Sequence, residues 1–422
     1  MSQVTLDATG VLRVAGKKLF PLGLSNPPPL GKLAPSGKQG LAEVAEAGIT
    51  LMRTGIETWS LNDFDAQIAQ QKALLDGAAG AGLLCWLWLG NAASHPVSST
   101  SEPVKLMTNI VANFKDHPGL GVWKGADEPA NPLRGQFVLP PPPLVRAYKK
   151  LKTLDPGRPL VIIQAPRGKV ADLVPYRPAF DITGADIYPI SYPPGIHTDT
   201  ANPDITVVGD MTRKMRQAAG GKPIWMTLQI AWSGAAPSTD HPDNVPRFPS
   251  LRQERFMAYE AIVDGARGLM FFGGHMTEVC TPEDAAAGWN WKFWREVLRP
   301  LVRELSSPEL RPALVVPEDA QNVRPKTARN DLEIAVRRGD GFLYVIAVKR
   351  GGDTAQIRLV GLPPRANGTP LTFGEVLFEY VQSPPPLPRV PGHQIHRHVP
   401  VKNAAFTDWF APYDVHVYRF TL

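Results

Sequence analysis

The sequence is poor in cysteine and has no long apolar run. Its 422 residues include two cysteines, Cys85 and Cys280, and no Cys-x-x-Cys pair. A framework of several disulfides, or a zinc site built on cysteines, is therefore excluded. No stretch of about eighteen apolar residues occurs, so we expect no membrane insertion. The start, MSQVTLDATG, has neither a basic nor an apolar segment, so it predicts no signal peptide and leaves the location open.

Charge of one sign is not concentrated anywhere along the chain. Lysine and arginine number 45 against 39 acidic residues, a net charge of +6, and the basic residues are scattered. Nucleic-acid binding normally needs basic residues clustered on one face, so we expect no nucleic-acid partner. Hydrophobic residues make up 43% and charged residues 20%, as in a globular chain, and the length fits two domains.

Short apolar runs alternate with helical patterns through the first three quarters of the chain. Each run is almost continuously hydrophobic, which is typical of parallel strands buried on both faces. The predicted strands are 19–24, 49–55, 83–90, 120–126, 159–165, 180–188, 223–230 and 268–274. Eight such units predict a closed (β/α)₈ barrel over residues 1–308. An open doubly wound sheet would need a phosphate-binding glycine loop after the first strand, and PLGLSNPPP has none.

The pattern changes after residue 308. The segment 331–362 reads as strands joined by a tight turn at Gly339-Asp340-Gly341, and FAPYDVHVYRFTL alternates with period two. The prolines of SPPPLPRVPG, at 383–392, cannot lie in a central strand. Residues 309–422 therefore predict a smaller antiparallel β-sandwich domain. The tract HQIHRH has no cysteine or carboxylate at zinc spacing, so it predicts a surface strand or loop.

Functional groups of a (β/α)₈ barrel lie at the carboxyl ends of its strands. These ends carry aromatic rings, amides and a few carboxylates, a mixture that suits sugars, whose C–H faces stack on rings and whose hydroxyls need donors and acceptors. Glycine loops with Lys/Arg clamps, or several histidines, would indicate phosphate or a metal; we expect neither a cofactor nor a metal. The candidate substrate-binding residues are Arg53, Trp88, Trp123, Gln164, Tyr188, Gln229, Trp232 and His275. We expect only one of Trp86 and Trp88 to face the barrel interior.

Glu128 is the strongest catalytic candidate. It follows the fourth predicted strand, beside Asp127 and before Pro129. Adjacent carboxylates in a cleft repel each other, which raises the pKa of one and keeps it protonated as an acid. Asp-Glu-Pro also occurs as a simple loop cap, but the strand-end position favours catalysis. Asp186, at the end of the sixth strand, fits a catalytic role and a loop-fixing role equally well.

Several segments resemble, in their order along the chain, the barrel glycoside hydrolases. They are LFPLGL, HPGLGVWKGADEP, FDITGADIYPI, KPIWMTLQIAW and EAIVDGARGLMFF, within residues 17–305, and APYDVHVYRF resembles the end of the β-sandwich that often follows such barrels. The resemblance implies that Glu128 is the acid/base and that the substrate is an oligosaccharide or polysaccharide. Arg53, at the end of the second predicted strand, could pair with a catalytic carboxylate and lower its pKa or could form a buried structural ion pair, and its position favours the site.

Two positions depart from this resemblance. Asp127 stands where the family usually has Asn, and Gln229 stands where retaining enzymes usually carry the nucleophilic Glu. An amide cannot form the covalent glycosyl intermediate. Three alternatives stay open: attack by a 2-acetamido group of the substrate that Asp127 orients, as in hexosaminidases with an Asp-Glu pair; a carboxylate from Asp186, with Glu57 or Glu278 behind it; or sugar binding without cleavage. The sugar, the linkage and the oligomeric state are left open.

Overall fold

The computed structural model describes residues 4–232, 239, 242–245, 247–276, 280–380 and 396–422, without the side chains of Arg134, Gln136 and Phe137. The chain forms two compact units. The first comprises Met1–Met257 and Gly265–Arg303, and the second comprises Ala258–Asp264 and Glu304–Leu422. The domain boundary that the sequence places at residue 308 stays a prediction.

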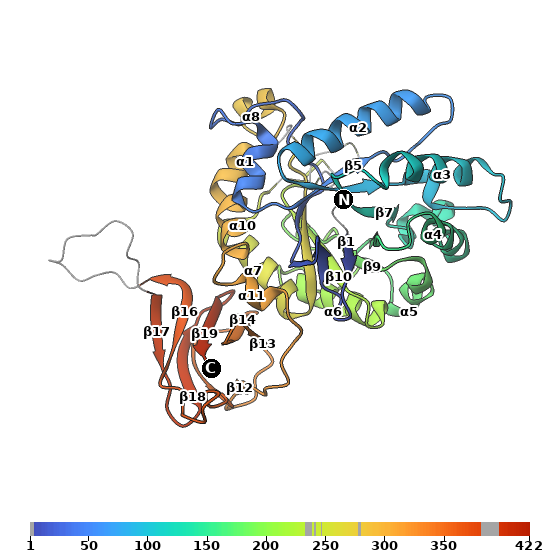
Figure 1. Ribbon diagram of the computed structural model, residues 1–422. Helices are drawn as coiled ribbons and strands as arrows, with labels where there is room; N and C mark the ends of the chain where they lie inside the picture. Colours follow the sequence, from blue (N-terminus) through green and yellow to red (C-terminus); the bar gives the residue numbers. More distant parts are fainter. Residues whose placement is uncertain (1–3, 233–238, 240–241, 246, 277–279, 381–395) are drawn as a thin grey trace. The chain divides into compact units, whose positions relative to one another are not determined.

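The first unit contains the predicted closed barrel (Figure 1). Eight strands pair in the order β10-β11-β4-β5-β6-β7-β8-β9, all parallel. Their bounds are β4 Leu22–Leu24, β5 Leu51–Gly55, β6 Leu84–Trp88, β7 Leu120–Asp127, β8 Leu160–Gln164, β9 Ile182–Ala185, β10 Ile224–Gln229 and β11 Ala266–Phe272. The fold prediction is confirmed.

Helices alternate with these strands. They are α1 Gly40–Ala47, α2 Phe64–Gly80, α3 Glu102–Phe114, α4 Pro141–Leu154, α5 Val170–Leu173, α6 Val207–Ala219 and α7 Leu251–Val263, with α8 Pro282–Ala287, α9 Trp291–Phe293, α10 Arg299–Leu305 and α11 Arg311–Leu314 after the last barrel strand. The stub expected between β8 and β9 is α5, whose four residues lead into a 3₁₀ turn that contains Pro178. None of the helices in the described ranges is long and apolar enough to cross a membrane.

A small antiparallel sheet closes the amino-terminal end of the barrel. It consists of β1 Val4–Leu6, β2 Leu12–Val14 and β3 Lys17–Leu19. Of the strand expected at 19–24, Leu19 therefore ends β3, residues 20–21 form a connection, and residues 22–24 form the barrel strand β4. Val4 and Leu12 share a core cluster with interior barrel residues such as Leu51 and Val122. The site is therefore confined to the opposite, carboxyl-terminal end.

The second unit holds two antiparallel sheets, as predicted. One has the order β12-β15-β18 and the other β13-β14-β19-β16-β17. The strands are β12 Arg324–Pro325, β13 Leu332–Gly339, β14 Phe342–Lys349, β15 Ala355–Val360, β16 Phe373–Tyr380, β17 His396–Pro400, β18 Ala405–Phe410 and β19 Val415–Thr421. Side chains from both sheets form one core, so the sheets pack face to face. The turn between β13 and β14 is the expected one, with positive φ at Asp340 and Gly341. The proline-rich tract lies outside the described residues.

Candidate active site

Strand β7 brings two charged side chains to one pocket through an irregularity in its pairing. Lys124 pairs with Val161 of β8, and Asp127 pairs with Ile163 after a register shift. Residues three apart on a regular strand face opposite ways. The bulge between them allows Lys124 and Asp127 to meet in an ion pair inside the barrel mouth.

Glu128 follows β7 with a strained backbone. Its φ is +44°, a left-handed value that costs a non-glycine residue about 1 kcal/mol or more. The backbone N–H of Glu128 donates to the Ile163 carbonyl at 2.8 Å, and the side-chain amide of Asn131 donates to its Oε2 at 2.8 Å. These contacts hold the half-buried carboxyl at the carboxyl end of the barrel, where Pro129 begins the next loop.

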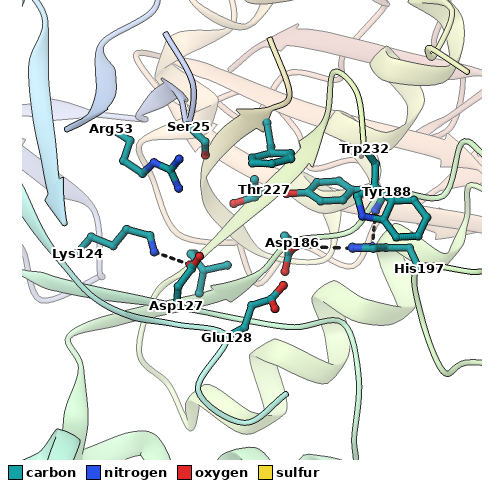
Figure 2. A pocket seen from close by; sticks show the side chains of 12 residues that line it. Ser25, Arg53, Lys124, Asp127, Glu128, Asp186, Tyr188, His197, Thr227 and Trp232 are labelled. Carbon is teal, nitrogen blue, oxygen red and sulfur yellow. Dashed lines mark hydrogen bonds and ion pairs between the residues drawn. The ribbon is translucent and has the colours of Figure 1, made fainter. Parts of the chain in front are cut away.

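The pocket at this end has a volume of about 210 Å³ (Figure 2). It is smaller than the roughly 300–1,000 Å³ of pockets for drug-sized ligands, so it suits a small unit such as one sugar ring. Its lining combines carboxyls, cations, hydroxyls and aromatic rings. The lining residues are Ser25, Arg53, Lys124, Asp127, Glu128, Ile163, Asp186, Tyr188, His197, Thr227, Trp232 and Phe272.

Asp186 follows the last residue of β9 and its carboxyl faces that of Glu128 (Figure 2). Burial, reinforced by the charges of Glu128 and Asp127, raises the pKa of Asp186 well above its ordinary range. Its Oδ1 is buried and has no hydrogen-bond partner among the described residues. The raised pKa favours the neutral, protonated form of Asp186.

Lys124 is almost completely buried and carries the counter-charge for Asp127. Burial lowers the pKa of Lys124 to about 8, against the opposing effect of Asp127, and the nearby Arg53 lowers it further. The Lys124 ammonium also lies 4.3 Å from the ring centre of Trp88 and 5.7 Å from that of Trp86. The two rings and the carboxylate favour the charged form and so offset part of the effect of burial.

An aromatic wall forms another side of the pocket. Tyr188 stacks on His197, with ring centres 4.4 Å apart, and on Phe272 at 5.3 Å, while Trp232 meets His197 edge-on at 4.6 Å. His197 accepts a hydrogen bond from the Tyr188 backbone N–H at 3.0 Å through Nδ1, which leaves the proton on Nε2. Burial lowers the pKa of His197 to about 3, so the ring is neutral. Its Nε2 lies 3.7 Å from Asp186, too far for a hydrogen bond.

Gln229 is completely buried and its amide is engaged by the backbone. Its Oε1 accepts from the Ile190 N–H at 3.0 Å, and its Nε2 donates to the Ile190 carbonyl at 2.7 Å and to the Arg247 carbonyl at 3.4 Å. The amide offers a donor and an acceptor side by side, which matches the N–H and the carbonyl of one residue. Gln229 therefore fixes the loop that follows Asp186, and it is absent from the lining of the pocket.

The structure brings six of the eleven candidate residues to the pocket lining. They are Arg53, Asp127, Glu128, Asp186, Tyr188 and Trp232. Trp88 lies beside it, next to the Arg53 guanidinium at 5.4 Å and to Lys124. Both Trp86 and Trp88 face Lys124, so the expectation that only one faces the interior is wrong, because residues two apart on a strand share a face.

The other candidates lie elsewhere. Trp123 is completely buried and donates to Asp155 at 2.9 Å, so it packs on the side of β7 opposite to Lys124 and is absent from the pocket lining. Gln164 accepts from the Ala130 N–H at 3.3 Å and so supports the loop after Glu128. His275 is exposed, with its ring edge-on to Phe272. Of the reserve carboxylates, Glu57 is exposed and outside the lining, and Glu278 lies outside the described residues.

Sequence reasoning missed Ser25, Lys124, His197, Thr227 and Phe272. Alternation along β7 means that Trp123 and Lys124 cannot both face the pocket, but counted back from Asp127 it selects Trp123, because the bulge is not visible in the sequence. His197 gave no signal, since it lies in a loop eleven residues after Asp186 and reaches the site through the fold. Thr227 Oγ1 and Trp88 Nε1 are buried without a hydrogen-bond partner among the described residues, and Thr227 lines the pocket. Such atoms are available to ligand hydroxyls.

No protein-family model matches the sequence, and no curated protein matches it. Solved structures do match over the whole chain. A structure described as a glycoside hydrolase has a TM-score of 0.59 at 13% identity, covering 100% of this chain and 97% of that one. A family 5 glycoside hydrolase from Bacteroides vulgatus has a TM-score of 0.63 at 12% identity, covering 99% and 92%.

A family 51 α-L-arabinofuranosidase from Bifidobacterium longum has a TM-score of 0.53 at 10% identity, covering 100% of this chain and 97% of that one. At identities this low the similarity shows a shared fold and does not show a shared activity, since barrels of one fold host many chemistries. The chain has the fold of these glycoside hydrolases, a closed eight-stranded parallel barrel followed by an antiparallel β domain.

Proposed function

We propose that this protein is a glycoside hydrolase in which Glu128 is the general acid/base and Asp186 is its partner. The observation that carries the proposal is the pair of facing carboxyls at the carboxyl end of the barrel, one of them buried with a raised pKa. Paired carboxyls of unequal pKa are what glycosidic cleavage requires, because one must give a proton while the other carries charge.

In the free protein the raised pKa of the buried Asp186 favours its protonated form, so this mechanism requires the proton to pass from Asp186 to Glu128 when substrate binds, which leaves Asp186 as a carboxylate. Glu128 gives this proton to the leaving oxygen as the bond from that oxygen to the anomeric carbon breaks. The Asp186 carboxylate then forms a bond to the anomeric carbon, and Glu128 deprotonates the water that later displaces Asp186. Trp232, which lines the pocket and is half-buried, gives the sugar ring a stacking surface.

A second route uses the substrate instead of Asp186 as the nucleophile. The ion pair with Lys124 supports an ionised Asp127, and such a carboxylate can orient a 2-acetamido group and stabilise its charge as it attacks the anomeric carbon. The two routes differ in the substrates that they accept. Only the second requires a 2-acetamido sugar.

Sugar binding without cleavage is the alternative function, and Gln229 is the observation that favours it. The amide at this position is fully engaged with Ile190 and supplies no nucleophile. The alternative predicts that sugars bind while no glycoside is cleaved.

The test is hydrolysis of a panel of aryl glycosides with 2-hydroxy and 2-acetamido sugars, with Glu128→Gln and Asp186→Asn as comparison variants. We expect turnover of at least one glycoside, with retention of the anomeric configuration in the first NMR-detected product. Inversion would refute both routes above. Binding of sugars in calorimetry with no turnover of any glycoside by the wild-type protein would favour the binding function instead.

A further inference from the structure

Arg53 is a cation in the pocket without an acidic partner among the residues that the structure describes. It is the third residue of β5, and its guanidinium points into the pocket beside Ser25, across from Glu128 and Asp186 (Figure 2). Among the described residues Arg53 makes no hydrogen bond and no ion pair. Its guanidinium makes a cation–π contact with Trp88, at 5.4 Å from the ring centre. The other pocket cation, Lys124, is paired with Asp127.

The surroundings of Arg53 favour an anion. A guanidinium presents a planar set of N–H donors that matches the two oxygens of a carboxylate. The Ser25 hydroxyl, beside it in the lining, also has no hydrogen-bond partner among the described residues and offers a further donor. Lys124 lies against the same Trp88 ring as Arg53, so a second positive charge is close to this end of the pocket.

None of the carboxyls that line the pocket forms an ion pair with the Arg53 guanidinium. Asp127 is held by Lys124, and the Glu128–Asp186 pair lies across the pocket. The positive end and the carboxyl pair are thus separated within a volume of about 210 Å³. A sugar with a carboxylate fits this polarity, because its negative group reaches the guanidinium while its anomeric centre reaches the carboxyl pair.

We propose that Arg53, together with the Ser25 hydroxyl, binds the carboxylate of an acidic sugar, so that the substrate carries a uronate in this pocket. The proposal names the substrate class of the proposed glycosidase and rests on that function for its use in catalysis. The binding of the acidic sugar itself does not depend on cleavage.

Binding of monosaccharides to the full chain tests the proposal without any bond being broken. The probes are D-glucuronate, D-galacturonate and D-mannuronate, each compared with its neutral hexose by titration calorimetry or saturation-transfer NMR. We expect at least one uronate to bind tenfold or more tightly than its hexose, with affinity that weakens as salt is added. Equal binding of the acidic and the neutral sugar would overturn the proposal.

Variants of Arg53 assign the effect to the guanidinium. Arg53→Gln keeps a polar side chain without the charge and should weaken uronate binding tenfold or more, with a much smaller effect on the binding of the neutral hexose. Arg53→Lys keeps the charge without the planar donors and should fall between the two. Arg295→Gln, at a side chain that is 60% exposed, is the matched control and should change nothing. Unchanged uronate binding in Arg53→Gln would overturn the proposal, as would sulfate that displaces uronate at equal concentration, which would indicate an anion site with no preference for acidic sugars.

Hydrolysis of aryl uronides separates this proposal from the proposed function. Uronate binding through Arg53 in a protein that cleaves no glycoside would overturn the hydrolase function and leave the acidic-sugar site standing. Cleavage of neutral glycosides with the same kcat/KM in wild type and Arg53→Gln, and no uronate binding, would overturn the acidic-sugar site and leave the hydrolase function standing.

Discussion

At the scale of single residues, the site is defined by which carboxyl is buried. Asp186 is 8% exposed and faces Glu128, which is half-buried. The sequence predicted the presence of both carboxyls near one another from their places at strand ends, but it held the catalytic and structural roles of Asp186 equal. Burial is a property of the closed barrel and of the loop fixed by Gln229, so no local pattern around Asp186 could predict its raised pKa.

The protonated state of Asp186 has a consequence for stability. Its folded-state pKa is raised, so between the ordinary Asp value of about 4 and the folded value the native chain holds a proton that the unfolded chain has lost. Stability is therefore lost as pH rises through this window. We expect Asp186→Asn to be more stable than wild type at pH 8, by an amount that shrinks toward zero as pH falls to about 4.

Thermal unfolding of Asp186→Asn and wild type from pH 4 to pH 8 measures this difference. A change of 1 kcal/mol moves Tm by about 2–4 °C for domains of 150–250 residues, so a difference of this order is detectable. Asp116→Asn, at an exposed carboxyl, is the control and should follow wild type at every pH. A Tm difference that is constant with pH would show that Asp186 is ionised in the folded protein.

At the scale of secondary-structure elements, the strands were predictable and their irregularities were not. The eight apolar runs lie within a few residues of the barrel strands, because burial on both faces leaves a continuous hydrophobic signal. The bulge in β7 left no such signal. Because of this bulge, Lys124 and Asp127 both reach the pocket while Trp123 faces the helices. The sequence therefore predicted the wrong place for Trp123 and did not identify Lys124.

Strand β10 offers a test of why an amide stands at its end. Gln229→Glu removes the donor to the Ile190 and Arg247 carbonyls and sets an oxygen against them. We expect a loss of about 1–3 kcal/mol for the unsatisfied carbonyls, and more when the new carboxyl is ionised. Because a buried carboxyl has a raised pKa, the destabilisation should grow as pH rises above about 4.

Unfolding of Gln229→Glu and Gln229→Met in urea at pH 5 and pH 8 measures this effect. The Met variant removes the hydrogen bonds without adding charge, so its loss should be the same at both pH values. A Glu variant as stable as wild type at pH 8 would contradict the assignment of Gln229 as a backbone clamp. We also expect Gln229→Ala to reduce turnover less than Glu128→Gln does.

At the scale of the whole molecule, the two-part organisation was predictable from the change of pattern near residue 308. The sequence did not predict that residues 258–264 belong to the second unit, because this depends on contacts between segments far apart in the sequence. Glu260 is completely buried and accepts from Arg350 at 3.0 Å, and Arg337 donates to the Ile262 carbonyl at 3.3 Å. These contacts make the last turns of α7 part of the β unit.

Loss of the Glu260 carboxylate should therefore destabilise the second unit. Loss of a hydrogen bond to a charged group costs about 1.5–3 kcal/mol, and Arg350 keeps an ion pair with Glu333 at 3.5 Å. We expect Glu260→Ala to lower the free energy of unfolding by this amount. Glu46→Ala, which removes an exposed partner of Lys38, is the control and should cost less than about 1 kcal/mol. Equal effects of the two substitutions in urea unfolding would show that residues 258–264 are not held by the β unit.

The central claim for the whole molecule is that Glu128 gives a proton to a leaving sugar oxygen. Its most direct test compares Glu128→Gln with wild type on two glycosides of one sugar, one with an alkyl leaving group and one with a nitrophenyl group. We expect a loss of about 10²–10⁴ in kcat on the alkyl glycoside and a much smaller loss on the nitrophenyl glycoside, which needs little protonation. Glu57→Gln, at an exposed carboxyl outside the pocket, should leave both rates unchanged. Unchanged turnover of the alkyl glycoside by Glu128→Gln, or equal losses on the two substrates, would contradict the claim.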